Sequence, residues 1–227
     1  MEIKQNIDKI RQLITQVAQE NNREATNIML LAVSKKQNVA SITEAFQQGI
    51  TNFGENYYQE ALFKIQELKH LPICWHFLGP VQSNKCKGIA TEFSWVHSIT
   101  RKKIALLLNE QRPSHFLPLN VCLQINLIAE ETKAGIEPGE AMELAKSISL
   151  LPHLNLRGLM TLPPPQKNPV EQYNLFKQLN YLMHAINKEG GLNMDTLSMG
   201  MSDDLIPAIQ AGSTIVRIGR AIFGERS

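Results

Sequence analysis

The sequence predicts a single (β/α)8 barrel preceded by one additional helix, and two observations support this fold class. Apolar strand-like runs alternate with helical patterns along the whole chain, giving about eight strands. No stretch of linker-like composition divides the 227 residues. Strands that alternate with helices are parallel, and this number of them favours a closed barrel over a doubly wound sheet. We therefore expect residues 1–227 to form one domain.

The N-terminal half supplies the additional helix and the first four strands. Five apolar residues at helical spacing predict an amphipathic first helix. They are Ile7, Ile10, Leu13, Ile14 and Val17. The wholly apolar run from Ile28 to Val33 is typical of a fully buried strand. The elements expected next are a helix over 39–48, a strand over 50–54, a helix over 58–68, a strand over 73–78, a helix beginning near 83 and a strand over 93–98.

The C-terminal half continues the alternation through four more strands. The expected order is a helix over 101–111, a strand over 119–127, a helix over 139–150, a strand over 154–161, a helix over about 170–186, and strands over 195–199 and 213–219 with a short helix between them. The proline-rich stretch 161–169 follows a strand and precedes a helix. We interpret it as a βα loop on the face of the barrel that carries active sites, and not as a domain boundary.

Composition narrows the classes of function. With 43% hydrophobic and 19% charged residues, the chain is ordinary for a globular protein with a substantial core. The net charge of +2 gives no field that would favour nucleic acid or an anionic membrane as partner. Three cysteines without C-x-x-C spacing argue against a disulfide framework and against a zinc site. We expect a cytoplasmic protein without an export signal or a membrane span.

The end of the first strand carries the clearest chemical signal. The strand runs directly into Ser34, Lys35 and Lys36, with no Gly or Pro between. Solvated loop lysines are the ordinary interpretation, because lysine is rarely buried unless it is paired. The alternative is an amine placed to react. Since side chains alternate between the two faces of a strand, only one of these lysines can face the barrel mouth, and we expect that one to be Lys35.

Other strand ends add weaker candidates, because the βα loops of a barrel build its site. Asn56 follows a Gly turn after the second strand, and His76 lies in the third. A histidine beside Trp75 and Phe77 is more often a hydrogen-bonded core residue than a ligand contact. Each candidate is weak when it is taken alone.

The loops after the last two strands are consistent with a phosphate site. Ser202 lies between a strand and a helix, and Gly219 and Arg220 follow the last strand. In barrels, these loops commonly bind phosphate through backbone N–H groups, where close approach requires Gly. The alternative is that Ser202 only caps the helix. Asp203 and Asp204 would repel a phosphate, so we expect both to point away from it.

An amine on one side of the barrel mouth and a phosphate site on the other define a ligand class. A phosphorylated aldehyde or ketone that forms an imine with the amine satisfies both features. Two classes of protein bind such ligands: class I aldolases and proteins that hold pyridoxal 5′-phosphate (PLP). Arg217 favours PLP, because a guanidinium at this position could face the pyridine nitrogen, whereas an aldolase would need an acid/base near Lys35.

Several motifs then match a known family in order and across nearly the whole chain. They are AVSKK, FGENYYQE, HFLGPVQSNK, GLMTLPP and SMGMSDDLIPAIQAGSTIVRIGRAIFG. Together they resemble the PLP homeostasis proteins, the YggS/PROSC-like family, and the last motif is similar to one of alanine racemases. The resemblance implies an alanine-racemase-like barrel, an imine on Lys35, and a role in vitamin B6 and amino-acid homeostasis without established turnover. The candidate PLP-binding residues are Lys35, Asn56, His76, Met199, Ser202, Arg217, Gly219 and Arg220, with no catalytic residue and no metal ligand.

Two departures from the family pattern are Lys36, where Thr is more usual, and Pro207, which falls within the helix expected after Ser202. Lys36 would lower the pKa of Lys35 by like-charge repulsion, or have no effect if it faces solvent.

An arginine against the pyridine nitrogen of PLP disfavours protonation of that nitrogen. The resemblance implies that racemases compensate with a tyrosine from a second domain. This chain is too short to include such a domain. We therefore expect a monomeric, non-catalytic PLP-binding protein whose partners are PLP and PLP-requiring apoenzymes or a regulatory protein. The alternatives are a small racemase-type PLP enzyme and, third, a class I aldolase.

Overall fold

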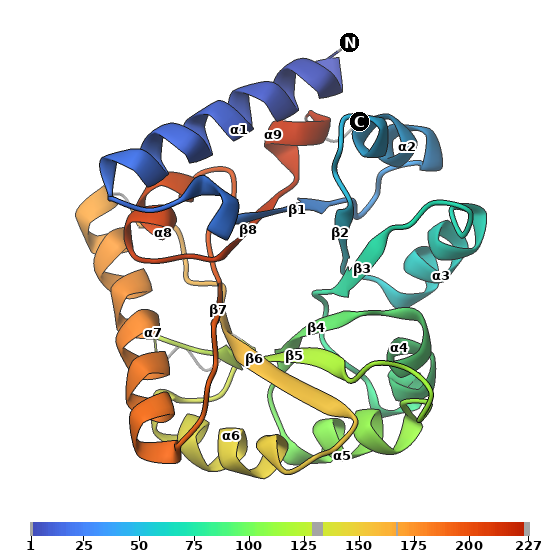
Figure 1. Cartoon of the computed structure of the whole chain (residues 1–227), viewed down its shortest axis with the longest axis vertical. Helices are drawn as coiled ribbons and strands as arrows, with labels where there is room; N and C mark the ends of the chain where they lie inside the picture. The colour runs from blue at the N-terminus through green and yellow to red at the C-terminus, as the bar shows by residue number, and fades with distance from the viewer. Residues whose placement is uncertain (1, 129–133, 167, 225–227) are drawn as a thin grey trace.

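The computed structural model describes residues 2–128, 134–166 and 168–224, and its centre is a closed barrel of parallel strands in sequential order from β1 to β8 (Figure 1). The strands are β1 (Met29–Val33), β2 (Asn52–Glu55), β3 (Cys74–Phe77), β4 (Trp95–Ile99), β5 (Leu119–Ile125), β6 (Leu154–Thr161), β7 (Thr196–Ser198) and β8 (Ile215–Ile218). The barrel closes where β8 pairs with β1. The predicted (β/α)8 fold is therefore confirmed.

Helices surround the barrel in the order that the sequence predicts (Figure 1). They are α1 (Glu2–Glu20), α2 (Val39–Gln47), α3 (Tyr58–Glu67), α4 (Cys86–Glu92), α5 (Lys102–Gln111), α6 (Ala141–Ser149), α7 (Pro169–Gly190), α8 (Leu205–Gln210) and α9 (Arg220–Phe223), with single 3₁₀ turns η1 (Ala25–Asn27), η2 (Ser83–Lys85) and η3 (Pro138–Glu140). The additional N-terminal helix α1 precedes β1 and packs against α8 and α9. The four-residue α9, immediately after β8, was not predicted.

Two hydrophobic clusters follow from the alternation of side chains along each strand. The larger cluster fills the space between the strands and the helices, and Phe53, Val96 and Leu197 belong to it. The smaller one lies inside the barrel, where Leu31, Trp95 and Met160 pack together. The barrel interior is therefore a packed core and not a pore.

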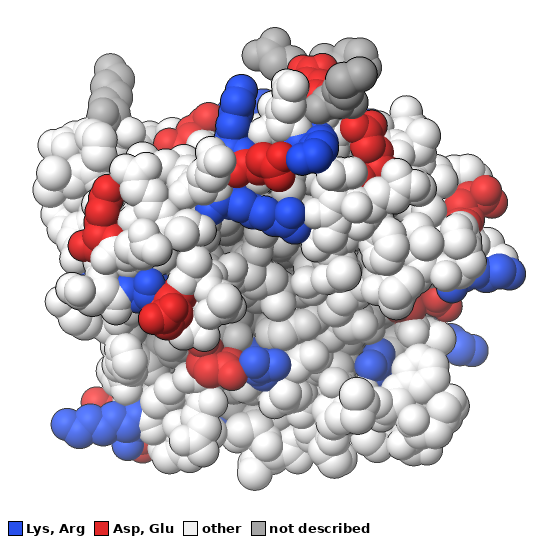
Figure 2. All heavy atoms as spheres, turned by 45° about the horizontal axis from the view of Figure 1, so that its top comes forward, with Lys and Arg blue, Asp and Glu red and all other residues white. Residues whose placement is uncertain are grey.

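The charged surface fits the small net charge of the chain. Figure 2 shows Lys and Arg interspersed with Asp and Glu over a face that is mostly uncharged. Within the ranges described above, no helix has the length and apolar character needed to span a membrane. His, Cys, Asp and Glu side chains in those same ranges form no group of three that could hold a metal ion.

Candidate functional site

A cavity of about 470 Å³ opens at the carboxyl end of the barrel strands. Its walls come from the ends of β1, β6 and β8 and from the loops after β1, β2, β3, β6, β7 and β8. The lining residues are Val33, Lys35, Asn56, Leu78, Met160, Leu162, Met201, Ser202, Asp203, Arg217, Gly219 and Arg220. Six of the eight candidates from the sequence are among them. The site lies on the face of the barrel where βα loops place functional residues.

Lys35 and Lys36 diverge as expected, but for a different reason. The strand β1 already ends at Val33, so strand alternation does not separate the two lysines. Lys36 instead adopts a left-handed backbone conformation with φ of 62°, which only a few per cent of non-glycine residues adopt. Its side chain is exposed and absent from the cavity wall, whereas the half-buried Lys35 lines the cavity. This placement favours the interpretation that Lys36 faces solvent.

A buried network behind the cavity holds the backbone on both sides of Lys35. The Lys64 ammonium, from α3, donates to the Ser34 carbonyl at 2.7 Å and forms ion pairs with Glu55 at 2.8 Å and Glu60 at 2.6 Å. Ser34 Oγ donates to Glu55 Oε1 at 2.6 Å. Glu60 Oε1 also accepts the Lys36 backbone N–H at 2.5 Å. The peptide groups that flank Lys35 are therefore both bonded to groups of one network.

Glu55 is the most buried member of this network, with a relative exposure of 0%. Burial raises the pKa of its carboxyl above the ordinary value, while the Lys64 ammonium and the hydrogen bonds from Lys64 and Ser34 act in the opposite direction. Its bonds with Ser34 and Lys64 both use Oε1, and Oε2 finds no hydrogen-bond partner among the described residues. The carboxylate is thus committed to Ser34 and Lys64 although half of its hydrogen-bonding capacity is unused.

Arg217 brings a cation to the cavity from inside the barrel. It lies on β8 in register with Leu31 of β1, so its side chain shares the inner face with the interior core. Its guanidinium donates to Ser198 Oγ at 2.9 Å and to the Thr161 carbonyl at 2.8 Å. Burial lowers its pKa to about 10, against the opposing charge of Asp204, so it remains cationic at neutral pH. Arg217 is therefore fixed and charged before any ligand arrives.

A directed chain of hydrogen bonds runs from Arg217 through the barrel interior. Ser198 Oγ accepts from Arg217 and lies 2.7 Å from His97 Nδ1. His97 Nε2 lies 2.9 Å from His76 Nδ1, and His76 Nε2 lies 3.1 Å from the Asn52 amide oxygen. Because that oxygen can only accept, each imidazole donates through Nε2 and accepts through Nδ1. Both histidines are then neutral, and burial correspondingly lowers the pKa of His76 to about 3 and that of His97 well below its ordinary value.

The loops after β7 and β8 face each other at one corner of the cavity. Ser202 Oγ accepts the Ala221 N–H at 3.4 Å, and Arg220 pairs with Asp203. At Gly219 a Cβ atom would lie 3.3 Å from the Val33 carbonyl oxygen, which is tighter than ordinary van der Waals contact. The Ser202 hydroxyl, the Gly219 backbone and the Arg220 guanidinium thus meet at one corner of the cavity, and Arg220 there balances the charge of Asp203; a hydroxyl and a guanidinium are groups that can bind an anion.

The two aspartates differ, so the expectation that both point away from this corner is wrong for Asp203, which lines the cavity and pairs with Arg220. Asp204 is buried and accepts the Met201 N–H at 2.5 Å. Asp204 and not Ser202 is the residue before α8, so Ser202 does not cap that helix. Pro207 is the third residue of α8, where a helix needs no backbone N–H donor, and it does not disturb the helix start.

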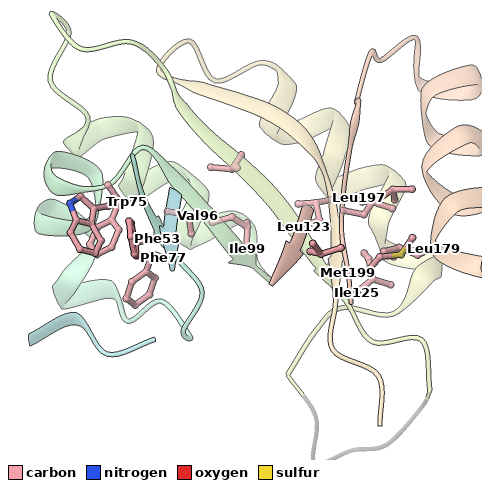
Figure 3. Packing of buried hydrophobic residues seen from close by; sticks show 14 of the residues in the cluster. Phe53, Trp75, Phe77, Val96, Ile99, Leu123, Ile125, Leu179, Leu197 and Met199 are labelled. Atoms are coloured by element: carbon pink, nitrogen blue, oxygen red, sulfur yellow. The ribbon is translucent and has the colours of Figure 1, made fainter. Parts of the chain in front are cut away.

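Two sequence candidates lie outside the cavity wall. His76 is a buried link of the hydrogen-bond chain and reaches the cavity only through His97, Ser198 and Arg217. Met199 packs outside the barrel near Ile125 and Leu179, because it follows the inward-facing Ser198 and points to the opposite face (Figure 3). Sequence reasoning missed Leu78, Leu162 and Met201, whose apolar side chains carry no chemical signal.

Comparison with known proteins places this geometry in a family. Residues 2–227 match the family model described as "Alanine racemase, N-terminal domain". A pyridoxal phosphate homeostasis protein of Pasteurella multocida is 49% identical over 229 residues, covering 100% of this chain and 98% of its own. One of the same name from Pseudomonas aeruginosa is also 49% identical, with coverage of 99% and 96%.

Solved structures agree with these matches. PipY of Synechococcus elongatus, whose structure is described with PLP bound, superposes with a TM-score of 0.87 at 32% identity, covering 98% of this chain and 100% of its own. Alanine racemase from Corynebacterium glutamicum has a TM-score of 0.73 at 16% identity; the match covers 99% of this chain and 61% of the racemase, and it shows the fold alone. With a full-length family match, relatives at almost half identity and the barrel described above, the chain belongs to the pyridoxal phosphate homeostasis proteins of the alanine racemase N-terminal domain family.

Proposed function

We propose that this protein holds PLP in the cavity through an imine between the aldehyde of PLP and Lys35, and that it serves PLP homeostasis without catalytic turnover. The observation that carries the proposal is the convergence of three groups on one cavity: the Lys35 amine, the Arg217 guanidinium and the corner formed by Ser202, Gly219 and Arg220. The names of the relatives and the PLP described in PipY support the same ligand.

The chemistry of the cavity fits the functional groups of PLP. Its volume of about 470 Å³ lies in the range of ordinary small-molecule sites. Leu78, Met160 and Val33 supply apolar wall for a flat ring, and the corner with Gly219 and Arg220 suits the phosphate. A side chain at Gly219 would be crowded against the Val33 carbonyl oxygen, and the absence of one leaves the backbone accessible to the phosphate.

Arg217 would face the pyridine nitrogen of the ring. When bound, PLP supplies a reactive aldehyde and a pyridine ring that can accept electrons. A guanidinium fixed by Ser198 and the Thr161 carbonyl cannot receive a proton and disfavours protonation of a nearby pyridine nitrogen. The ring would then be a weak electron acceptor, which suits binding more than turnover.

The ionisable groups of the cavity support the same conclusion. Besides Lys35 and Arg217, the lining residues with ionisable side chains are Asp203 and Arg220, and these two pair with each other. Proton transfer on both faces of a substrate requires a positioned base on each face. None of the described lining residues other than Lys35 is a histidine, tyrosine, cysteine or lysine that could act as the second base.

A cytoplasmic setting fits the same chemistry. Residues 1–227 would act as one PLP-binding unit and as a monomer, in the cytoplasm, where its three free cysteines would remain thiols. A reversible imine permits PLP to be passed to an apoenzyme, so PLP-requiring apoenzymes are the partner class that this chemistry favours.

The test compares two adjacent lysines. Lys35→Ala should abolish the yellow band that borohydride bleaches, while noncovalent PLP binding persists through the phosphate corner and Arg217. Lys36→Ala is the matched control and should keep the band, since its side chain lies outside the cavity. Borohydride reduction, digestion and mass spectrometry then locate the label. Label on Lys36, or on a lysine elsewhere such as Lys85, would show that Lys35 is not the lysine that forms the imine. Absence of any label would show that the protein does not bind PLP through an imine.

A further inference from the structure

The loop that carries Lys35 is held from outside the barrel, on the side opposite the cavity. Val33 faces the cavity, whereas Ser34 faces α3 and the end of β2: its carbonyl accepts from Lys64 of α3 and its hydroxyl donates to Glu55, the last residue of β2. On the other side of Lys35, the N–H of Lys36 donates to Glu60. The three side chains Glu55, Glu60 and Lys64, here called the α3 clamp, thus bond the residues immediately before and after Lys35.

Stability alone is a poor explanation for the α3 clamp. Lys64 is 3% exposed and Glu55 is 0% exposed, so both charges pay a large desolvation penalty. A buried ion pair recovers that penalty only when all of its polar atoms are satisfied, and Glu55 Oε2 has no partner in the described part of the chain. Apolar residues of similar volume would stabilise such a position as well or better. What the clamp provides specifically is a fixed position for the Ser34 carbonyl and the Lys36 N–H.

The backbone at Lys36 shows why fixing is needed. A left-handed φ of 62° is disfavoured at a non-glycine residue and persists only where the surroundings enforce it. The bond from the Lys36 N–H to Glu60 enforces it directly, and the bond from Lys64 to the Ser34 carbonyl fixes the preceding peptide. Without these bonds the turn would sample other conformations, and the backbone that positions the Lys35 side chain would no longer be fixed.

We propose that Lys64, supported by Glu55 and Glu60, is a positioning residue for Lys35, and that the α3 clamp sets the rate at which Lys35 forms its imine. This inference rests on the proposed function of Lys35. The clamp touches neither the phosphate corner nor Arg217, so it acts on the covalent step and leaves noncovalent recognition in place. Displacement of a reacting group by about 1 Å is enough to lower a rate by up to about a hundredfold.

The principal variant is Lys64→Met, which keeps the aliphatic stem and removes the ammonium. We expect the rate of imine formation with added PLP, followed by the yellow absorbance, to fall about tenfold or more. Affinity for pyridoxine 5′-phosphate, which lacks the aldehyde and cannot form an imine, should change by less than about threefold. In the protein without PLP, amide hydrogen exchange over residues 34–37 should become faster.

The matched control is Arg112→Met. Arg112 is also a buried cation that donates to backbone carbonyls, here those of Ala90, Phe93 and Leu117, but none of its partners lines the cavity. This control measures what loss of a buried cation does to the fold in general. It should lower stability and leave the rate of imine formation within about twofold of the wild type.

A second variant separates positioning from charge neutralisation. Lys64→Met leaves Glu55 buried without its cation, whereas Glu55→Gln combined with Lys64→Met removes both charges. The double variant should regain stability and still form the imine slowly, because the Ser34 carbonyl remains unanchored. Recovery of the wild-type imine rate, or an unchanged rate in Lys64→Met, overturns the positioning role. If the wild type itself forms no imine on Lys35, the proposed function fails and this inference fails with it.

Discussion

The two histidines inside the barrel make stability depend on pH in a direction that can be worked out. Both are fully buried and neutral, with the pKa of His76 lowered to about 3 and that of His97 lowered well below the ordinary 6.5. In the unfolded chain each imidazole takes up a proton near pH 6.5. Below that pH the unfolded state therefore binds more protons, and the free energy of unfolding falls as pH falls from about 6.5 toward 3.

The size of the effect follows from the pKa difference. One pH unit is worth about 1.4 kcal/mol per proton, so one histidine that stays neutral in the fold removes about 2 kcal/mol of stability between pH 7 and pH 5. His97→Gln eliminates one such group while keeping its bonds: the amide can donate to His76 and accept from Ser198. The stability loss between pH 7 and pH 5 should then be about 2 kcal/mol smaller in the variant than in the wild type.

Urea unfolding at both pH values measures this difference, and any pH-independent cost of the substitution cancels. The raised pKa values of the buried carboxyls Glu55 and Asp204 act in the opposite direction, since these groups lose stabilisation as pH rises, but they do so in both proteins. His184→Gln, at an exposed helix position, is the control and should follow the wild type. Equal pH dependence in wild type and His97→Gln would refute the neutral, buried histidine chain.

Two further predictions concern PLP. Gly219→Val should weaken PLP affinity by about tenfold or more with a smaller effect on folding, because its Cβ would lie 3.3 Å from the Val33 carbonyl oxygen and obstruct the phosphate corner. Equilibrium dialysis measures the affinity, and an unchanged value would exclude Gly219 from the site. The purified, PLP-loaded protein should not racemise alanine above background in a chiral chromatographic assay, and steady turnover of about 1 per second or faster would establish the racemase-type alternative instead.

The barrel and most of the cavity wall could be predicted because they depend on repeating signals. Alternating strand and helix patterns fix the strand order, and strand order fixes which loops share a face. Lys35, Arg217 and Gly219 could therefore be grouped before their distances were known. The separation of Lys35 from Lys36 was expected from strand alternation, whereas a left-handed turn at Lys36 produces it.

Other parts of the site depend on contacts between distant elements, which no local pattern reports. In the sequence, Lys64 looks like an ordinary solvent-exposed lysine of an amphipathic helix. It is buried because α3 packs against the ends of β1 and β2. His76 was a candidate for a ligand contact, although a hydrogen-bonded core histidine was the more usual interpretation. Its relation to the cavity depends on His97 and Ser198, which carry no signal in the sequence. Met199 faces the helices because it directly follows the inward-facing Ser198. The strand β7 has three residues, too few for the sequence pattern to show which of its faces points into the barrel.

The seam between β8 and β1 has a consequence for the order in which the site is assembled. Lys35 follows the first strand and Arg217 lies on the last, so the two sides of the cavity meet only when Ile215–Ile218 pairs with β1. On its other edge β8 joins β7 through a single pair in register, Ser198 with Ile215. During synthesis, a chain that has emerged through β7 presents the amine but neither Arg217 nor the phosphate corner. The last strand therefore completes both the barrel and the binding site. A ligand bound there stabilises the closed barrel, because the site exists only after β8 has paired with β1.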